Sequence, residues 1–419
     1  MNTSTLGSDR KIASISFPTW VASKLPILMA TWLFLSVLGP HQELYKVFFH
    51  GVIVPAVLVL FFSKKLQFSG VDSLLKVALC FFAYAGIATF FVGLGPIEGH
   101  LRALRWSIEA AFCLLALWAW LPTVMRQPMW WARYLLVITF VASIAAIIKF
   151  VFFDSMQGRL SGFGGLHNPI QAASVFLVYW AIAHFVISRQ ASEALAKDRF
   201  LLFLTFISVV MAVLLSESRG PIVAMLVYLS FLAIIDLRSG FRLGNSLFWV
   251  VGVAGAGGAV AFMYGPEMLI DQLMARGTSY RLDIWKGYLE YPPGSWLFGF
   301  GLGTESAYVP AVEAFWRPNG IPVFHPHSVY VGTLIETGII GVAFLLLMIG
   351  LLLKSIYNAV LVPQDKMRLL GLLGLVFILT LTVSQGVISS IKMLWLFFWF
   401  PVVFVWFWSK ARRRDNRIS

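Results

Sequence analysis

Residues 328–353 read SVYVGTLIETGIIGVAFLLLMIGLLL, a run in which Glu336 is the only charged side chain. A helix needs about 20 consecutive apolar residues to cross the hydrocarbon core of a bilayer. The run is therefore long enough to span a membrane. It begins directly after the polar segment His325-Pro326-His327, so this part of the chain carries a span and, at its end, a group of side chains that can do chemistry.

The composition indicates that lipid, and not water, surrounds most of the chain. Hydrophobic residues make up 59% of the 419 residues and charged residues only 12%, about half of the ~25% typical of soluble domains. Cys80 and Cys113 both fall in apolar runs, which indicates buried thiols and neither a disulfide framework nor a metal site. The basic residues behind the net charge of +13 lie between apolar runs, as topology signals do, which argues against nucleic acid as a partner.

Working outward from residues 328–353, the same length criterion predicts an all-α polytopic membrane protein with about twelve transmembrane helices. The N-terminus is polar through Lys24, and no small-residue cleavage site follows the first apolar stretch. We therefore expect a retained first helix and not a removed signal peptide. The predicted ranges are 25–40, 47–63, 74–94, 106–124, 131–152, 169–188, 200–216, 220–237, 246–264, 328–353, 368–387 and 393–409.

The distribution of basic residues predicts the orientation of these helices. If the N-terminus is cytoplasmic, the inside segments hold 21 of the 32 Lys and Arg residues, and each segment holds at least two. Cytoplasmic loops carry such an excess, so both termini are expected in the cytoplasm. The expected parts are nine helices over residues 1–264, a long periplasmic loop over 265–326, three helices over 327–409 and a basic cytoplasmic tail over 410–419.

The long outer loop contains a helical pattern. Apolar residues between Ile284 and Leu289 recur at helical spacing, which predicts a short amphipathic helix on the outer membrane–water interface. A Pro-Pro-Gly break at 292–294 follows, and then a glycine turn from Gly299 to Gly303 that we expect to be mobile. This turn is not a dinucleotide-binding fingerprint, because it follows no buried strand and its spacing differs.

Polar residues expected on the outer side gather in four places, among which Arg219 has the most defined setting. It lies between two apolar runs beside Pro221, which suits the first turn of a helix. A guanidinium beside unpaired helix N–H groups forms an anion site suited to a phosphate. As an alternative, Arg219 extends to lipid headgroups or pairs with Glu217. The four places are residues 159–169, 216–221, Arg276 with Arg281, and 325–328.

His327 is the candidate base. An imidazole near its ordinary pKa of ~6.5 accepts a proton at neutral pH. Two alternatives are an ordinary interfacial histidine and a metal site shared with His325, although no third ligand stands at a suitable spacing. Glu336, deeper in the same helix, is a functional candidate. The alternatives are an ion pair with a buried Arg or Lys and a protonated carboxyl group. Several arginines with one or two histidines predict a substrate with several phosphates and proton abstraction from a hydroxyl.

The motifs in these places resemble those of bacterial O-antigen ligases and of the wider O-antigen ligase and polymerase superfamily. The resemblance runs from about residue 155 to 345 and depends on the order, spacing and membrane side of the motifs together. The matching elements are His327-Ser328 followed after nine residues by Gly338-Ile-Ile-Gly341, Ser218-Arg219-Gly220, Arg281 with Trp285 and the Gly299–Gly303 turn, and Arg159 with Gly162 and Asn168-Pro169.

This resemblance implies a GT-C-like, inverting, metal-independent glycosyltransferase of the Gram-negative inner membrane, with a periplasmic active site and no cofactor. The donor would be O-antigen on undecaprenyl pyrophosphate, and the acceptor a hydroxyl of the lipid A–core oligosaccharide. His327 would be the general base, and Arg219 and Arg281 would hold the pyrophosphate and stabilise it as it leaves. The long loop would cover the site when substrate binds. The expected substrate-binding residues are Arg159, His325, Ser328, Ser218, Trp285, Asn168 and Arg276.

Three other functions fit parts of the sequence. The O-antigen polymerase and the protein O-oligosaccharyltransferase share the donor, but the first tends to have two sizeable outer loops and the second an extra C-terminal soluble part. A twelve-helix transporter is an alternative of another class. Transporters commonly have two related halves with polar helices near the midplane, whereas the polarity here lies at one face and the long loop has no counterpart in the first half.

Overall fold

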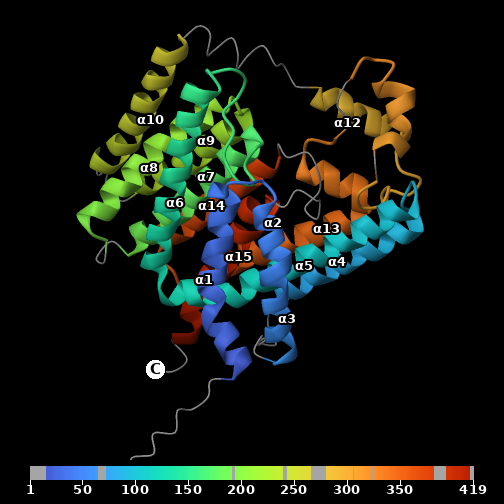
Figure 1. Ribbon diagram of the computed structural model, residues 1–419, viewed down its shortest axis with the longest axis horizontal. Coiled ribbons are helices and arrows are strands. Elements are labelled where there is room, and N and C mark those ends of the chain that lie inside the picture. The colour runs from blue at the N-terminus through green and yellow to red at the C-terminus, as the bar shows by residue number, and fades with distance from the viewer. Residues whose placement is uncertain are drawn as a thin grey trace, which may run out of the picture.

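The computed structural model describes residues 16–64, 72–190, 194–238, 243–265, 280–304, 306–321, 325–381 and 393–415. Every regular element in these ranges is a helix, and none of them contains a strand. Most helices form one packed body, and a smaller lobe around α12 (Arg281–Glu290) lies beside it (Figure 1). We define this lobe, called the loop lobe below, as the described residues between 280 and 321.

Nine helices in the described part of the chain are long and apolar enough to cross a membrane. Two of them contain π-helical segments, named η1 and η2. The nine are α1 (Phe17–Leu38), α2 (Leu44–Phe48) continued by η1 (Phe49–Ile53) and α3 (Val54–Phe62), α4 (Ser73–Val92), α5 (Ile97–Arg126), α6 (Pro128–Ile148) continued by η2 (Lys149–Phe153), α7 (Pro169–Arg189), α8 (Ala196–Leu215), α9 (Arg219–Arg238) and α13 (Val329–Tyr357).

The expected number of about twelve spans is therefore replaced by nine such helices and several that are shorter or more polar. Each predicted range overlaps a helix. However, α10 (Leu243–Tyr264) and η5 (Trp395–Trp399) with α15 (Phe400–Asp415) provide only the shorter apolar helices Trp249–Met263 and Trp395–Lys410. The helix α14 (Pro363–Thr380) carries three charged residues within its first six positions, Asp365, Lys366 and Arg368.

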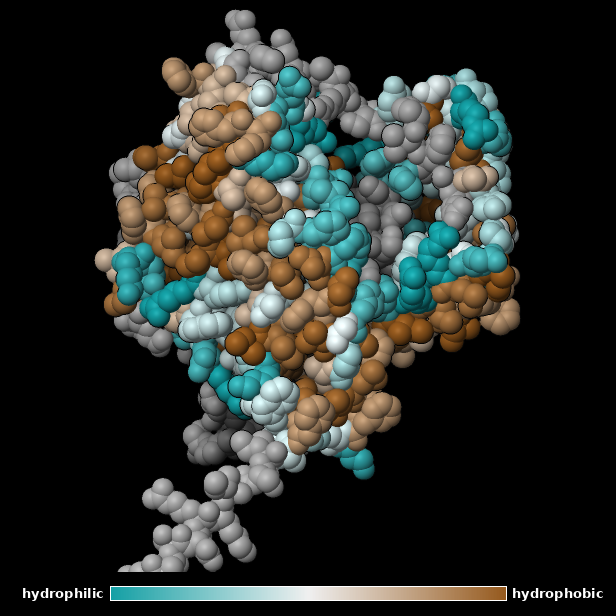
Figure 2. All heavy atoms as spheres, viewed as in Figure 1, coloured by the Kyte–Doolittle hydropathy of each residue, from teal (hydrophilic) through white to brown (hydrophobic). Residues whose placement is uncertain are grey.

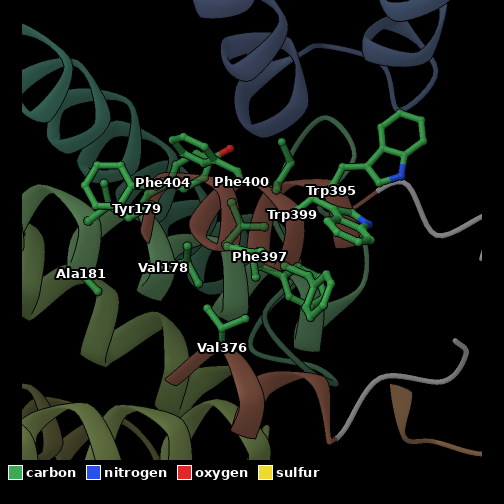
Figure 3. Close-up of a cluster of buried hydrophobic side chains, with 14 of the residues drawn as sticks. Val178, Tyr179, Ala181, Val376, Trp395, Phe397, Trp399, Phe400 and Phe404 are labelled. Atoms are coloured by element: carbon green, nitrogen blue, oxygen red, sulfur yellow. The ribbon is translucent and has the colours of Figure 1, made fainter. Parts of the chain in front are cut away.

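The body is built around α7, whose residues from Ala172 to Ile187 are all buried. A helix that is apolar on every side is stable only when other elements enclose it. The helices α6, α8 and α14 and the η5 segment pack around it. Tyr179 and Val178 of α7 face the aromatic residues of η5 and α15 (Figure 3), and the rings of Tyr179 and Phe400 meet edge to face with centroids 5.9 Å apart.

The loop lobe has a hydrophobic core of its own. Ile284 and Tyr288 of α12 pack with Trp316 at the end of η4 (Val312–Trp316), and the rings of Tyr288 and Trp316 lie 4.8 Å apart. The helical spacing in the sequence thus predicted a real helix. Its place on the membrane–water interface stays a prediction. Ile284 and Tyr288 face the lobe core, while Leu289 is 70% exposed.

A break in α13 fastens the loop lobe to the body. Gly338 has φ 66° and ψ −168°, a conformation that only glycine adopts readily. At this break, backbone groups of the helix form hydrogen bonds with the lobe and not within the helix. The Phe300 N–H donates to the Ile335 carbonyl at 2.7 Å, and the Ile339 N–H donates to the Trp296 carbonyl at 2.8 Å. The outer turns of α13 are therefore bonded to the lobe as well as to the rest of the helix.

The glycine turn of the lobe, expected to be mobile, is packed against the helical body. A Cβ atom on Gly299 would lie 2.5 Å from the Ile335 carbonyl oxygen, and one on Gly301 would lie 2.6 Å from the Cα of Gly93. Nearby, the Leu302 N–H donates to the Thr89 hydroxyl at 2.9 Å. The glycines are thus needed because the turn packs backbone against backbone on α13 and on the end of α4.

Candidate active site

His327 stands immediately before α13 in a constrained position. Its φ of 51° lies in the left-handed region, which is rare for residues other than glycine. The next residue, Ser328, is buried and caps the helix by accepting a hydrogen bond from the Val331 N–H at 3.4 Å. The cap and the left-handed residue together fix the direction in which the chain enters the helix, and with it the place of the imidazole.

Trp285 of α12 holds the same segment from the lobe side. Its indole N–H donates to the carbonyl of Pro326 at 2.8 Å. Pro326 lies between His325 and His327, so this one bond connects α12 to both histidines. Trp285, expected to contact substrate, is therefore placed as a support for the histidine segment.

Arg281 and Arg219 lie within each other's electrostatic field although 62 positions separate them. Arg281 is the first residue of α12 and is half-buried, and its Nε has no hydrogen-bond partner among the described residues. Burial lowers the pKa of Arg281, and the positive charge of Arg219 lowers it further. Two guanidinium groups held this way repel each other, and an anion with several oxygens would offset that repulsion.

His327 belongs to the same group of charges. Burial lowers its pKa to about 4, with smaller contributions from Arg281 and His325 in the same direction. Burial also lowers the pKa of His325. His327 is therefore a neutral imidazole at neutral pH and is able to accept a proton. The sequence motifs at residues 219, 281 and 325–328 thus converge on one place in the fold.

Arg159 supports the reversal that presents Arg219. Its Nε donates to the Ser216 carbonyl at 2.8 Å, and its Nη2 donates to the Ser218 hydroxyl at 2.7 Å. Within the reversal Glu217 is buried with φ 48°, and Arg219 is exposed at the start of α9. Arg159 and Ser218, both expected to bind substrate, are thus bonded to each other.

The other expected site residues have different settings. Asn168 caps α7, where its side chain accepts hydrogen bonds from Ile170 N–H at 2.9 Å and Gln171 N–H at 3.4 Å. Arg276 lies outside the described residues. Within the described ranges, no three His, Cys, Asp or Glu residues lie close enough together to hold a metal ion.

Two structural roles were not expected from the sequence. Glu336 lies near Tyr288 beneath the loop lobe, since its negative charge raises the pKa of that phenol in addition to the larger effect of burial. Gly338 breaks helix α13 at the point where the lobe is bonded to it, whereas the sequence motif predicted only the spacing of this glycine from His327. A glycine two residues after an ionisable residue, in an otherwise apolar run, was the available signal for both.

Hydrophilic residues gather around a hollow between the helical body and the loop lobe (Figure 2). The outer surface of the body is largely hydrophobic in the same view, as expected for a surface that faces lipid. The arrangement provides two cations for an anionic group and a neutral imidazole for a hydroxyl proton.

Comparisons with known proteins give a family and a relative for the chain. The profile of a family described as O-antigen ligase matches residues 201–346, a range that contains Arg219, Arg281 and His327. The chain is also 25% identical over 399 residues to an O-antigen ligase of Pseudomonas aeruginosa, and the match covers 90% of this chain and 89% of the relative.

Proposed function

We propose that this chain, a multi-pass membrane enzyme that belongs to the O-antigen ligase family, transfers an O-antigen glycan from undecaprenyl pyrophosphate to a hydroxyl of the lipid A–core oligosaccharide. The observation that carries the proposal is the mutual electrostatic influence of Arg219, Arg281 and His327. These residues come from α9, α12 and the segment before α13. Only the folded chain brings the phosphate-binding cations and the base together.

In the proposed reaction, the acceptor hydroxyl gives its proton to His327 while its oxygen attacks the anomeric carbon of the donor glycan. The bond between that carbon and the pyrophosphate oxygen breaks, and undecaprenyl pyrophosphate leaves with the electron pair. Attack from the opposite side inverts the anomeric centre. Arg219 and Arg281 stabilise the charge that develops on the leaving group, which is the largest kind of contribution in such sites.

The charge of the donor also adjusts the base. Arg281 lowers the pKa of His327 in the structure. A pyrophosphate bound to Arg281 offsets that positive charge, so donor binding raises the pKa of His327 toward neutrality, where a general base is most effective. The imidazole thus becomes a stronger base only when a glycan is present to be transferred.

The orientation proposed for the chain places this site on the periplasmic side and both termini in the cytoplasm, because the basic residues favour it. The division into residues 1–264, 265–326, 327–409 and 410–419 belongs to the same proposal. Its support in the fold is the separate core of the loop lobe, which distinguishes that segment from the helices on either side.

The test uses purified full-length protein in detergent with lipid A–core, an undecaprenyl-pyrophosphate-linked glycan and EDTA. Wild type should yield a ladder of heavier lipopolysaccharide, and His327→Ala and Arg219→Ala should lose it by about 100-fold or more. Arg238→Ala, at the other end of the same helix as Arg219, is the matched control and should remain active. Near-normal transfer by His327→Ala would overturn the proposed mechanism.

The same experiment separates the related functions. If wild type ignores lipid A–core and the lipid-linked glycan becomes longer, the enzyme is a polymerase with the same site. If a peptide acceptor is glycosylated instead, it is an oligosaccharyltransferase. Activity that disappears on addition of EDTA would contradict metal independence.

A further inference from the structure

A second group of charged side chains lies inside the membrane-spanning helices, on elements that the proposed catalytic site does not use. Glu109 of α5 is buried, and its carboxylate lies 2.8 Å from the His50 Nε2 and 3.7 Å from the Arg105 Nε. Both α5 and the helix that contains His50 are among the nine candidate spans. Ionisable groups in such helices are rare and usually mark a site for a polar or charged ligand.

The hydrogen bonds of His50 fix its ring beside Glu109. Its Nδ1 lies 2.8 Å from the Lys46 carbonyl, and its Nε2 lies 2.8 Å from the Glu109 carboxylate. Both ring nitrogens thus face oxygen atoms of the protein. Arg105, whose Nε lies 3.7 Å from the same carboxylate, supplies a full positive charge beside this pair.

The helix around His50 is locally distorted. It lies in the π-helical segment η1, between the α-helical segments α2 and α3. Single π-helical turns inside α-helices occur frequently at functional sites. Here Phe49 is fully buried against Trp32 and Trp395. The aromatic contacts fix the distorted turn and with it the direction of the His50 ring.

Arg105 and His50 are both accessible. The Arg105 side chain is 66% exposed and the His50 side chain 43% exposed. Arg105 approaches Glu109 through Nε at a distance longer than a hydrogen bond, so its two terminal nitrogens lie still farther from the carboxylate. Lys46, paired with Glu43 at 2.6 Å, lies one helical turn before His50. The group therefore presents the guanidinium of Arg105 outward, next to the pair formed by His50 and Glu109.

The charges of α5 follow one face of that helix. Glu98, Arg102, Arg105 and Glu109 are spaced so that they share this face. The pair α4–α5 extends from the body beneath the loop lobe (Figure 1), and hydrophilic residues lie along its side toward the hollow, above a hydrophobic underside (Figure 2). A lipid at this place would meet cations at its headgroup and apolar side chains along its tails.

This second group comes from other elements than the first. His50 lies on η1 and Arg105 on α5, whereas Arg219 begins α9, Arg281 begins α12 and His327 precedes α13. A transferase with two lipid substrates in one leaflet needs separate cations for each, because an acceptor held by Arg219 and Arg281 would compete with the leaving pyrophosphate.

We propose that Arg105 of α5, positioned beside the pair formed by Glu109 and His50 of the distorted α2–α3 helix, binds a phosphate group of the acceptor glycolipid. The inference relies on the proposed function for the identity of the acceptor. The ligand class is a phosphate-bearing lipid headgroup, and the source is the phosphorylated lipid A portion of the acceptor. Bound there, the lipid places its oligosaccharide in the hollow that leads toward His327.

The test measures binding of lipid A to the full-length protein in nanodiscs of phosphatidylcholine. The ligands are lipid A with its phosphates, lipid A from which they have been removed, phosphatidylglycerol and undecaprenyl pyrophosphate. The variants are Arg105→Gln, His50→Gln and Arg105→Lys, with Arg126→Gln at the other end of α5 as the matched control. Thermal unfolding of each variant reports whether the helical body is intact.

Arg105→Gln and His50→Gln should each weaken binding of phosphorylated lipid A about tenfold and leave dephosphorylated lipid A and undecaprenyl pyrophosphate within twofold. Arg105→Lys should recover most of the affinity, and Arg126→Gln should bind as wild type. In transfer assays the KM for the acceptor should rise while the KM for the donor stays constant.

Unchanged binding of phosphorylated lipid A in both variants would overturn the proposal. Equal weakening of phosphatidylglycerol would also overturn it, since the site would then bind phospholipids in general. If wild type transfers no glycan but binds lipid A in a manner that depends on Arg105, the proposed function fails and this binding site stands.

Discussion

Replacing Gly338 by alanine tests whether the docked loop lobe is required for transfer. The residue has φ 66° and ψ −168°, and a Cβ atom there would lie 2.2 Å from the Leu297 carbonyl oxygen. Backbone strain of this kind costs about 1–3 kcal/mol, and overpacking costs about 1–3 kcal/mol more. The total of roughly 2–6 kcal/mol acts on the contact between α13 and the lobe.

We expect the lobe to detach before the helical body unfolds, because the penalty falls on the few backbone bonds that join them. Since about 2 kcal/mol corresponds to a factor of about 30 in an equilibrium, the ratio of docked to detached lobe should fall at least 30-fold, and glycan transfer should fall with the docked fraction. Hydrogen exchange gives a second measure. The amides of Phe300 and Ile339, which bond across the break, should lose protection while those of α7 keep it.

Gly350→Ala is the matched control in the same helix. A Cβ atom at Gly350 meets no atom within 4 Å, and alanine in a helix interior is favoured over glycine by about 0.5–1 kcal/mol. This variant should be as active as wild type and slightly more stable. If Gly338→Ala keeps the activity and the amide protection of Gly350→Ala, the reasoning about the docked lobe is refuted.

Three further predictions concern the candidate site. Trp285→Phe removes the indole N–H that holds the histidine segment, so kcat should fall about tenfold with little change in KM, and an unchanged kcat would rule out this support. In the pH profile of kcat/KM, activity should rise through about pH 4 as His327 loses its proton and then stay level. Arg281→Gln removes a positive charge that lowers the pKa of His327. The residual activity of this variant should therefore rise at a higher pH than that of wild type. Arg159→Lys should lower the thermal unfolding midpoint because one of its two bonds to the reversal at Ser218 is lost, and an unaltered midpoint would contradict that role.

The sequence predicted the positions of the helices well, because an apolar run in a membrane has few alternatives to a helix. The number of spans was less well predicted, since α14 begins with Asp365, Lys366 and Arg368 in its first two turns and is not among the nine candidate spans. For α12 the spacing was sufficient for the helix but not for its partner. Ile284 and Tyr288 form a small protein core, and an apolar face toward protein has the same periodicity as one toward lipid.

The candidate site, like the fold, could be predicted from the sequence only in part. The motifs gave the residue types that meet, Arg219, Arg281 and His327, because each has a chemistry that an outer-face anion site needs. They did not distinguish groups that face the ligand from groups that hold the chain. Arg159 and Asn168 are both polar outer-loop residues in sequence, and only their bonding to the 216–218 reversal and to the α7 N-terminus reveals supporting roles.

The backbone bonds across the break at Gly338 determine which parts of the candidate site share a support. Arg281 lies on the loop lobe, and the outer turns of α13 that follow His327 are bonded to the same lobe. Arg219 belongs to α9 in the helical body. The candidate base and one arginine therefore have a common foundation, and the other arginine stands on a separate one.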